Sequence, residues 1–411
     1  MVIKNINGVK DLLKKTSNCN FQLKNKSILN YLYKFYSEFV EIEKKQFNIK
    51  PIKTQKITSI QQISNISNLN SSFISKEILH FIKNNTVIEI IYKQKIRNRT
   101  ITLYFIIQDT KQYSNDIHDT RKICENIFIW YDFIFKYASS NCCKTLDIYI
   151  YLTPLKKLMP AKTSDVLSYN NANTGFTTNC VKNGSIVIYR KEELIKVLIH
   201  ESFHVLGLDF SKRVSENTFI FLKSIFPISS DLNINETYTE VWSEILNIVF
   251  TLFLSKRETK VSLKKEDIIE QIYNMIQIET IFSTFQMIKI LNFMNMDYSD
   301  LYANNEKSSI LRLHYYREET NIFAYYIATP IFLFYYDDFI EWCNINNSNI
   351  LKFNSNSDMQ IKFVKFLKKK YKTDKFLNFI QCIESTFFQL GDHYDKYETL
   401  MNTLRMTIIE N

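Results

Sequence analysis

The amino-acid sequence predicts an α+β fold in which a lobe built on a mixed β-sheet is followed by a mainly helical lobe. Two observations lead to this prediction. Runs rich in β-branched and aromatic residues gather between residues 86 and 189, whereas apolar residues recur at helical spacing almost throughout the part after residue 207. In addition, only five glycines and five prolines occur among 411 residues, so tight turns are few and helices should dominate.

We expect three parts along the chain. Residues 1–85 form an N-terminal helical region, which has a clear helical pattern at 28–43 and a polar loop at 59–72. Residues 86–212 form the sheet-bearing lobe, and residues 213–411 form the helical lobe. A cleft between two such lobes is a common place for a functional site.

The sheet-bearing lobe is expected to combine strands with two helices. The β-rich runs at 87–92 and 100–107 are joined by a basic polar turn and predict a hairpin. The elements that follow are a helix, three strands and a second helix, at 119–137, 146–152, 175–176, 186–189 and 190–206. This order suits a twisted mixed sheet with helices packed on it.

The helical lobe begins after Gly207, which is well placed to end the preceding helix. The expected helices lie at 216–225, 236–254, 265–294, 320–336, 358–371, 375–390 and 394–409. The longest apolar run, at 322–336, is broken by Pro330 and is short for a bilayer span. We therefore expect a buried helix there and no transmembrane segment.

Charge and cysteine content narrow the class of protein. The formal net charge is +10, but the lysines are scattered and no basic block is interleaved with aromatic residues, so we expect a solvated basic surface and no nucleic-acid partner. The seven cysteines show no paired spacing beyond the adjacent Cys142 and Cys143, which predicts reduced thiols in an intracellular protein. The first 15 residues lack the apolar core of a secretory signal.

The helix predicted at 190–206 carries the pattern H-E-x-x-H at His200, Glu201 and His204. Residues four apart lie one turn above each other on a helix, so both imidazoles can reach one metal ion. Glu201 then lies where a carboxylate can take a proton from a metal-bound water. This combination is typical of a zinc hydrolase site.

The surroundings of the pattern favour this interpretation over two plainer ones. Leu194, Leu198 and Val205 form an apolar stripe beside the histidines, and we expect Glu192 and Glu193 in the first turn, where the helix dipole favours acids. A chance match is rare, on the order of one in a few hundred for a chain with six histidines. A core helix with two satisfied histidines would bury polar groups at a high cost without a metal.

A catalytic zinc ion usually takes three protein ligands and keeps a fourth position for water, so a third ligand is needed. The longer pattern H-E-x-x-H-x-x-G-x-x-H fails here, because Phe210 stands where the last histidine should be. Asp209 is one residue early for the aspartate form of that pattern and is a weak candidate.

A stronger set of candidates follows Asn235, which can cap a helix. Glu236, Glu240 and Glu244 recur at every fourth residue and so share one helix face. Three like charges stacked in this way repel one another. Either a cation or exposure to solvent would relieve that repulsion.

The H-E-x-x-H pattern and residues 235–240, with the sequence NETYTE, together resemble the gluzincin superfamily of zinc metallopeptidases. That group pairs H-E-x-x-H with a downstream helix of the form N-E-x-x-[AST]-[DE]. The resemblance covers about residues 145–250 and implies a zincin-like sheet lobe with one zinc ion per chain. The ligands that it implies are His200, His204 and Glu236, and Glu240 would orient a ligand histidine through the other ring nitrogen.

A second register stays open, in which Glu240 is the ligand and Glu244 supports it. Residues 240–244, with the sequence EVWSE, also resemble the E-x-[aromatic]-[small]-E form of some toxin-like members. The combined patterns, with the strong bias toward Asn, Lys and Ile, resemble uncharacterised metallopeptidase-like proteins of giant DNA viruses. We therefore expect an intracellular location, either cytoplasmic or associated with a virus particle.

The resemblance also suggests residues that contact a substrate. In related enzymes an edge strand ahead of the motif helix binds the substrate backbone by β-augmentation, and Gly175 and Phe176 lie in that place. A tyrosine or histidine from the second lobe often stabilises the oxyanion. The candidates for this role are His314, Tyr315 and Tyr316.

We expect, from the motif and the resemblance, a zinc-dependent metallopeptidase that acts on a peptide or protein substrate with Glu201 as general base. The first alternative is a non-catalytic structural protein, or one that contacts a virion or host component, in which the metal site serves stability alone. The second alternative is a nucleic-acid-binding protein driven by charge, for which steep salt dependence of binding would be diagnostic.

Overall fold

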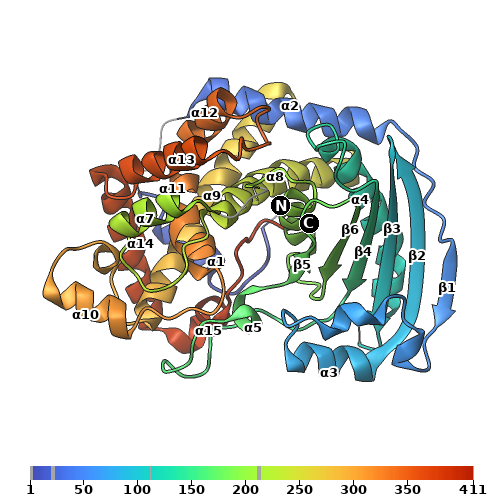
Figure 1. Ribbon diagram of the computed structural model, residues 1–411, viewed down its shortest axis with the longest axis horizontal. Helices are drawn as coiled ribbons and strands as arrows, with labels where there is room; N and C mark the ends of the chain where they lie inside the picture. The colour runs from blue at the N-terminus through green and yellow to red at the C-terminus, as the bar shows by residue number, and fades with distance from the viewer. Residues whose placement is uncertain (1–2, 20–23, 112, 211–213, 411) are drawn as a thin grey trace.

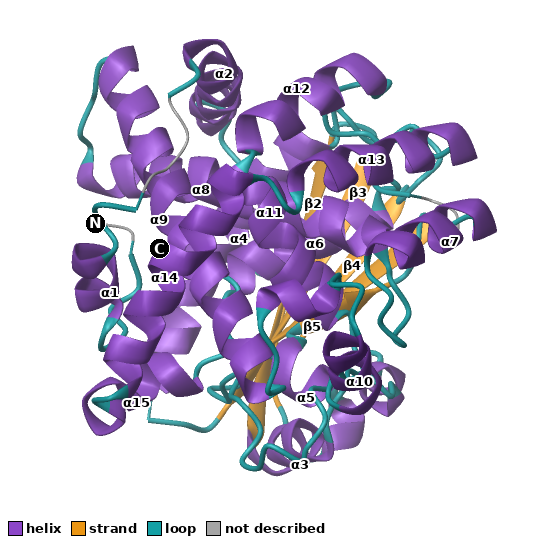
Figure 2. Ribbon diagram, turned by 90° about the vertical axis from the view of Figure 1, so that its left-hand side faces the viewer, coloured by secondary structure: helices purple, strands orange, loops and turns teal. Residues whose placement is uncertain are grey.

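The computed structural model describes residues 3–19, 24–111, 113–210 and 214–410 and has the α+β architecture that the sequence predicts. One mixed six-stranded sheet occupies one side of the molecule, and helices fill the remainder (Figure 1). Figure 2 shows the helical side, with the sheet lying behind the helices. Among the described residues, no helix is both long and apolar enough to cross a membrane.

The strand order across the sheet is β1-β2-β3-β4-β6-β5. The strands are β1 (Lys53–Lys56), β2 (Thr86–Ile96), β3 (Arg99–Gln108), β4 (Thr145–Tyr151), β5 (Gly175–Thr177) and β6 (Asn183–Ile188). The predicted hairpin is confirmed, because β2 and β3 pair antiparallel. β4 runs parallel to both β3 and β6, and β5 pairs antiparallel with β6 at the edge nearest the helices (Figure 1).

Both faces of the sheet are covered by other parts of the chain. The side chains of β4 alternate between the two hydrophobic cores that result. Ile148 and Ile150 point to one face and join the main core with the helices. Tyr149 and Tyr151 point to the other face, where a second core forms with residues 57–82. This second layer contains two short 3₁₀ turns and α3 (Lys76–Asn85), so the expected loop at 59–72 is more ordered than the sequence indicates.

Besides α3, the helices in the part of the chain up to residue 210 are α1 (Val9–Lys15), α2 (Lys26–Glu43), α4 (Tyr113–Ile134), α5 (Tyr169–Ala172) and α6 (Leu194–Val205). The helices after residue 213 are α7 (Glu216–Ile225), α8 (Ile234–Thr259), α9 (Lys265–Phe293), α10 (Glu306–His314), α11 (Thr329–Phe334), α12 (Tyr336–Asn346), α13 (Ser357–Lys370), α14 (Asp374–Gly391) and α15 (Tyr394–Asn402). The short α10 and the polar strand β1 were not expected from the sequence pattern.

Two of the expected helices end differently. The helix expected at 320–336 begins as a π-helical turn, Phe323–Ala328, continues as α11 and breaks at Tyr335, whose backbone leaves the helical region. π-helical turns are rare and often lie at functional sites. The last helix ends at Asn402, because residues 403–409 run as a buried segment beside the start of α6 and bond to it.

The expectation that all cysteines are reduced is wrong for this structure. Cys19 pairs with Cys382 and Cys142 pairs with Cys180, with Cα–Cα distances of 5.8 and 5.0 Å. Cys124, Cys143 and Cys343 are free and buried. The partners are 363 and 38 residues apart in the chain, so spacing alone could not reveal them.

The N-terminal region is joined to the other two parts by many contacts. β1 extends the sheet beside β2, and α2 packs against α4, α8 and α9. The expected boundary at residue 212 lies outside the described residues. The division into 1–85, 86–212 and 213–411 stays a prediction.

Candidate metal centre

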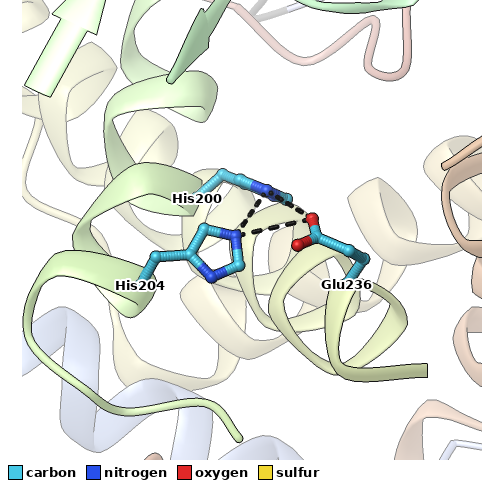
Figure 3. Close-up of side chains that lie close together, drawn as sticks. All are labelled: His200, His204 and Glu236. Atoms are coloured by element: carbon cyan, nitrogen blue, oxygen red, sulfur yellow. Dashed lines mark hydrogen bonds and ion pairs between the residues drawn. The ribbon is translucent and has the colours of Figure 1, made fainter. Parts of the chain in front are cut away.

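Three side chains from two helices meet at one point of the interior. His200 and His204 come from successive turns of α6, and Glu236 comes from the first turn of α8 (Figure 3). The two Nε2 atoms are 3.1 Å apart, and Glu236 Oε2 lies 3.4 Å from that of His200 and 3.5 Å from that of His204. Among the described residues, these three form the one group of potential ligands that could hold a metal ion.

The triangle formed by these three atoms has the size that a small cation requires. Sides of 3.1, 3.4 and 3.5 Å place the point equidistant from all three atoms about 1.9 Å from each. Zinc takes histidine nitrogens and carboxylate oxygens at about 2.0–2.2 Å. The spacing of these three atoms therefore fits a zinc ion that His200, His204 and Glu236 would hold.

The other nitrogen of each imidazole is held by a carboxylate. His200 Nδ1 lies 2.8 Å from Glu240 Oε2, and His204 Nδ1 lies 2.7 Å from Asp209 Oδ2. A carboxylate accepts a hydrogen bond at this position, so each Nδ1 donates and each Nε2 is turned toward Glu236. Burial acts to lower the pKa of both imidazoles, but the carboxylates around them outweigh it and raise the pKa, so an ion would bind each Nε2 in exchange for a proton. The sequence predicts this arrangement for Glu240, but it indicates Asp209 only as a weak ligand candidate.

Buried contacts fix the position of α6 in front of the sheet. Its face opposite the cleft carries Ser202, whose hydroxyl lies 3.0 Å from Trp130 Nε1 and 3.0 Å from the Tyr131 hydroxyl, both on α4. The predicted apolar stripe is also buried, since Leu198 and Val205 have no exposed surface. Burial on this side turns the two histidines toward the cleft.

The start of α6 differs from the prediction. The helix begins at Leu194, so Glu192 and Glu193 are not in its first turn, and Glu193 adopts a left-handed conformation with φ of 58°. Their carboxylates bind the C-terminal segment instead. Glu193 accepts the backbone N–H groups of Met406 and Thr407 at 2.8 and 2.7 Å and also pairs with Lys157.

The C-terminal segment is also bound to Glu192 by an ion pair. Arg405 lies 3.0 Å from Glu192 and 3.0 Å from Glu410. These contacts neutralise the acids more specifically than a helix dipole could.

The three stacked glutamates of α8 point inward rather than to solvent. Asn233, and not Asn235, precedes the helix. Glu240 and Glu244 are 0% and 1% exposed, which rules out solvent as the relief for their repulsion. Glu236 alone of the three lines the open cleft.

A buried lysine offsets part of the repulsion among these glutamates. Lys196, one turn before His200 on α6, pairs with Glu240. Burial acts to raise the pKa of Glu240, but Lys196 and His200 outweigh it and lower the pKa to about 2. For Glu244, burial and the nearby Glu279 and Glu240 raise the pKa well above its ordinary value, which favours the neutral form of its carboxyl group.

Glu201 lines two cavities, and His200 lines both of them as well. Burial raises the pKa of its carboxyl group, although His200 and His204 act in the opposite direction. Burial acts in the same way on Glu236, but there the adjacent histidines outweigh it and hold its pKa well below the ordinary value. Glu236 is thus the ionised member that a cation requires.

A cleft of about 600 Å³ opens onto the cluster. Gly175 and Phe176, the substrate-binding candidates, line one side as part of the edge strand β5. His200, His204 and Glu201 also line it. The free edge of β5 therefore borders the cluster, as expected for a strand that binds an extended peptide.

The candidates for oxyanion stabilisation do not lie at the cluster. His314 and Tyr315 line a separate cavity with Arg317, and Tyr316 is buried next to Glu318. The residue in that place is Tyr325, from the π-helical turn, which lines the cleft and donates its hydroxyl proton to Glu236 Oε2 at 3.0 Å.

Tyr325 is one of 25 tyrosines in the chain, and nothing in its local sequence distinguishes it. Its ring centroid lies 5.8 Å from that of His200. Only the π-helical turn, which the periodicity of the sequence does not indicate, brings this side chain to the ligands.

No protein-family model, curated protein or solved structure matches the chain.

Proposed function

We propose that the protein is a zinc-dependent metallopeptidase of the gluzincin type. The observation that carries the proposal is the pair of carboxylates behind the pair of histidines: Glu240 and Asp209 hold both Nδ1 atoms, so both Nε2 atoms face Glu236. A purely structural zinc site usually has a fourth protein ligand. Among the described residues, the cluster here has only three potential ligands and lies beside an open cleft.

Zinc bound by these three residues would supply an acidified water and polarise the scissile carbonyl group. Glu201 is the residue that takes the proton of the attacking water and passes it to the leaving amine. Its raised pKa suits a group that must both accept and release a proton. Glu201 lines the same cleft as His200 and His204.

The substrate is an extended peptide. Thr174 and Thr178 bond to β6, so in the alternating antiparallel pattern the backbone N–H and C=O groups of Gly175 and Thr177 face away from β6. Both residues line the cleft beside Phe176, and these groups are available to an added strand. The Tyr325 hydroxyl group, on the opposite lobe, is placed to donate to the oxyanion that develops at the scissile carbonyl carbon.

The first test is the zinc content of the purified protein and of three variants. We expect about one zinc ion per chain in the wild type, loss in His204→Ala and Glu236→Gln, and retention in Glu240→Gln with weaker affinity, by roughly 10- to 100-fold. Full loss in Glu240→Gln together with retention in Glu236→Gln would instead favour the second register. Absence of zinc from every preparation, even after zinc is supplied, would contradict the proposal.

The second test is cleavage of a peptide library. Glu201→Gln should keep the metal and lose turnover, and Tyr325→Phe should keep the metal while kcat falls by roughly 100-fold or more. Normal turnover in Glu201→Gln would refute the mechanism. A wild type that binds zinc and cleaves no peptide would favour the non-catalytic structural or host-interaction alternative.

An intracellular location, cytoplasmic or virion-associated, belongs to the same proposal. The two disulfides weigh against a reducing compartment, because such bonds are rare in cytosolic proteins. Titration of thiols in the denatured, unreduced protein tests this point. Three reactive thiols per chain indicate the paired state, and seven indicate the reduced state.

A further inference from the structure

Helix α13 and the residues after it present one side that is almost wholly lysine. We call this side the lysine face. Its exposed members are Lys362, Lys365, Lys368, Lys369, Lys372 and Lys375. The opposite side of α13 carries Phe363, Val364 and Leu367, which have no exposed surface. The expectation that no basic block is interleaved with aromatic residues is wrong for this segment, because seven of the 14 residues at 362–375 are lysine and aromatic residues stand between them. Helical geometry places most of these lysines on one outer surface and turns the rings inward.

The charges of the lysine face are largely uncompensated. Among the described residues, Lys362, Lys365, Lys369 and Lys375 form no side-chain hydrogen bond or ion pair. The Lys368 ammonium lies over the Phe221 ring, 5.2 Å from its centroid, and leaves its charge unpaired.

The nearby acids compensate little of this charge. Asp338 pairs with Lys370, which lies outside the lysine face and is only partly exposed. The exposed acids closest in the chain are Asp358, near the start of α13, and Asp374, beside Lys375. Helix α7 adds a third exposed acid, Glu216, because the neighbouring Ser215 bonds to Gln360 of α13. Six lysines against three acids leave a net positive surface.

Apolar side chains lie beside the lysine face. Helix α7 packs against α13, and both views of the molecule show the two helices side by side on the outside (Figures 1 and 2). Ile220, on the outer side of α7, is 58% exposed. Phe221 next to it is half-buried beneath Lys368. Unpaired lysines next to an exposed isoleucine are typical of surfaces that contact a membrane interface.

We propose that the lysine face, with Ile220 beside it, binds the surface of an anionic phospholipid bilayer. The lysines meet the phosphate and carboxylate groups of the lipid heads, each raising binding by a factor of roughly five. Ile220 enters the boundary between head groups and acyl chains. Binding of this kind is peripheral and depends on charge, so salt should weaken it.

A lipid surface fits this face better than a nucleic acid does. The segment 357–375 contains no arginine for bidentate contacts with bases or phosphates. Its rings at Phe363, Phe366 and Tyr371 are buried or half-buried, so none is fully exposed for base stacking. An exposed isoleucine adds nothing to phosphate binding but contributes to contact with a bilayer.

The lysine face also has a fixed relation to the cleft. Phe363, on the inner side of α13, packs against Phe210, with ring centroids 5.9 Å apart, and Phe210 lines the cleft. One helix diameter, about 10 Å, therefore separates the cleft wall from the bound bilayer. The membrane proposal itself does not depend on the metal centre.

The test is co-sedimentation of the full chain with vesicles of phosphatidylcholine alone, or with about one-third phosphatidylserine. The test variant replaces Lys362, Lys365, Lys369 and Lys372 by Gln. The matched control replaces four exposed lysines on the sheet side by Gln, which gives the same change in net charge: Lys50, Lys53, Lys95 and Lys144. Ile220→Ser provides a second variant that leaves the charge unchanged, and a labelled single-stranded oligonucleotide provides the competing ligand.

We expect the wild type to bind the anionic vesicles and not the neutral ones. Binding should fall several-hundred-fold in the four-lysine variant, fall far less in the control, and fall several-fold in Ile220→Ser. Equal losses in the test variant and the control would overturn the proposal, because binding would then follow net charge alone. Equal binding to both vesicle types, or binding to the oligonucleotide without binding to vesicles, would also overturn it. Unchanged melting temperatures show that each variant is folded.

Discussion

The chemistry of single residues in the site is set by their hydrogen-bond partners. His200 and His204 could each carry the ring proton on either nitrogen, and the carboxylates of Glu240 and Asp209 select Nδ1. Without such partners an imidazole would divide its proton between both nitrogens, and its affinity for a metal would fall. Asp209 therefore matters to the proposed site although it is not one of the three potential ligands.

Asp209→Asn tests this role. The amide can still accept a hydrogen bond from His204 Nδ1 but carries no charge, so the imidazole becomes a poorer ligand. We expect zinc affinity to fall by roughly 10- to 100-fold, measured by competition with a chromogenic chelator.

A matched control is available on the surface. The Asp119 carboxylate lies 3.8 Å from Nδ1 of the exposed His118, and neither of these two residues lines the cleft. Asp119→Asn should leave zinc affinity unchanged. Equal affinities in Asp209→Asn and the wild type would show that Asp209 does not orient a ligand.

The elements around the site are held by contacts at their ends. Gly207 ends α6 with a left-handed φ of 62°, a conformation that other residues adopt at a cost. It also lies against the disulfide between Cys142 and Cys180: a Cβ atom at Gly207 would stand 3.1 Å from Cys180 Cβ. The end of α6 is thus packed against the disulfide, and Gly207 and Cys180 both line the cleft.

We expect Gly207→Ala to lower the free energy of unfolding by about 1 kcal/mol or more, because the new methyl group meets both the strained φ and the disulfide. Chemical denaturation with a two-state fit measures the change. Gly391→Ala is the control: its Cβ would meet nothing closer than 3.8 Å, and it lies at the end of α14. That variant should be neutral or slightly stabilising. Equal effects of the two substitutions would refute the explanation.

At the scale of the whole molecule, buried acids link folding to pH. Glu279 on α9 has no exposed surface, and Thr407 of the C-terminal segment donates to it at 2.8 Å. Burial raises its pKa from 4.5 to about 8, with the nearby Glu193 acting in the same direction, while Thr407 and Lys196 act against them. The folded protein therefore keeps a proton on Glu279 that the unfolded chain releases above about pH 4.5.

The sign of the pH dependence follows from this difference. Between pH 4.5 and about 8 the folded state binds more protons than the unfolded state, so this residue makes stability fall as pH rises. Glu279→Gln removes the ionisable proton and should flatten the slope by up to about 1.4 kcal/mol per pH unit, measured by denaturation across this range.

Glu341→Gln, at an exposed position of α12, controls for the change in formal charge and should keep the wild-type slope. The slope expected for the wild type also includes Glu244, whose pKa is raised by burial and by Glu279 and Glu240. A Glu279→Gln variant with an unaltered slope would show that Glu279 is ionised in the fold.

The sequence by itself determined the features that depend on local periodicity. The hairpin, the α+β class, most helices and the placement of His200 and His204 on one helix face all follow from spacings of two, three or four residues. The stack of Glu236, Glu240 and Glu244 follows from the same rule, and the structure does bring Glu236 to the two histidines.

Only the tertiary structure decided which distant groups meet. Tyr325 reaches Glu236 from 89 residues away, and the C-terminal segment reaches Glu193 from more than 200. The disulfides and the position of the lysine face beside α7 depend on packing in the same way. Local sequence encodes the direction of a side chain on its own element, whereas the position of one element against another depends on burial summed over the whole core.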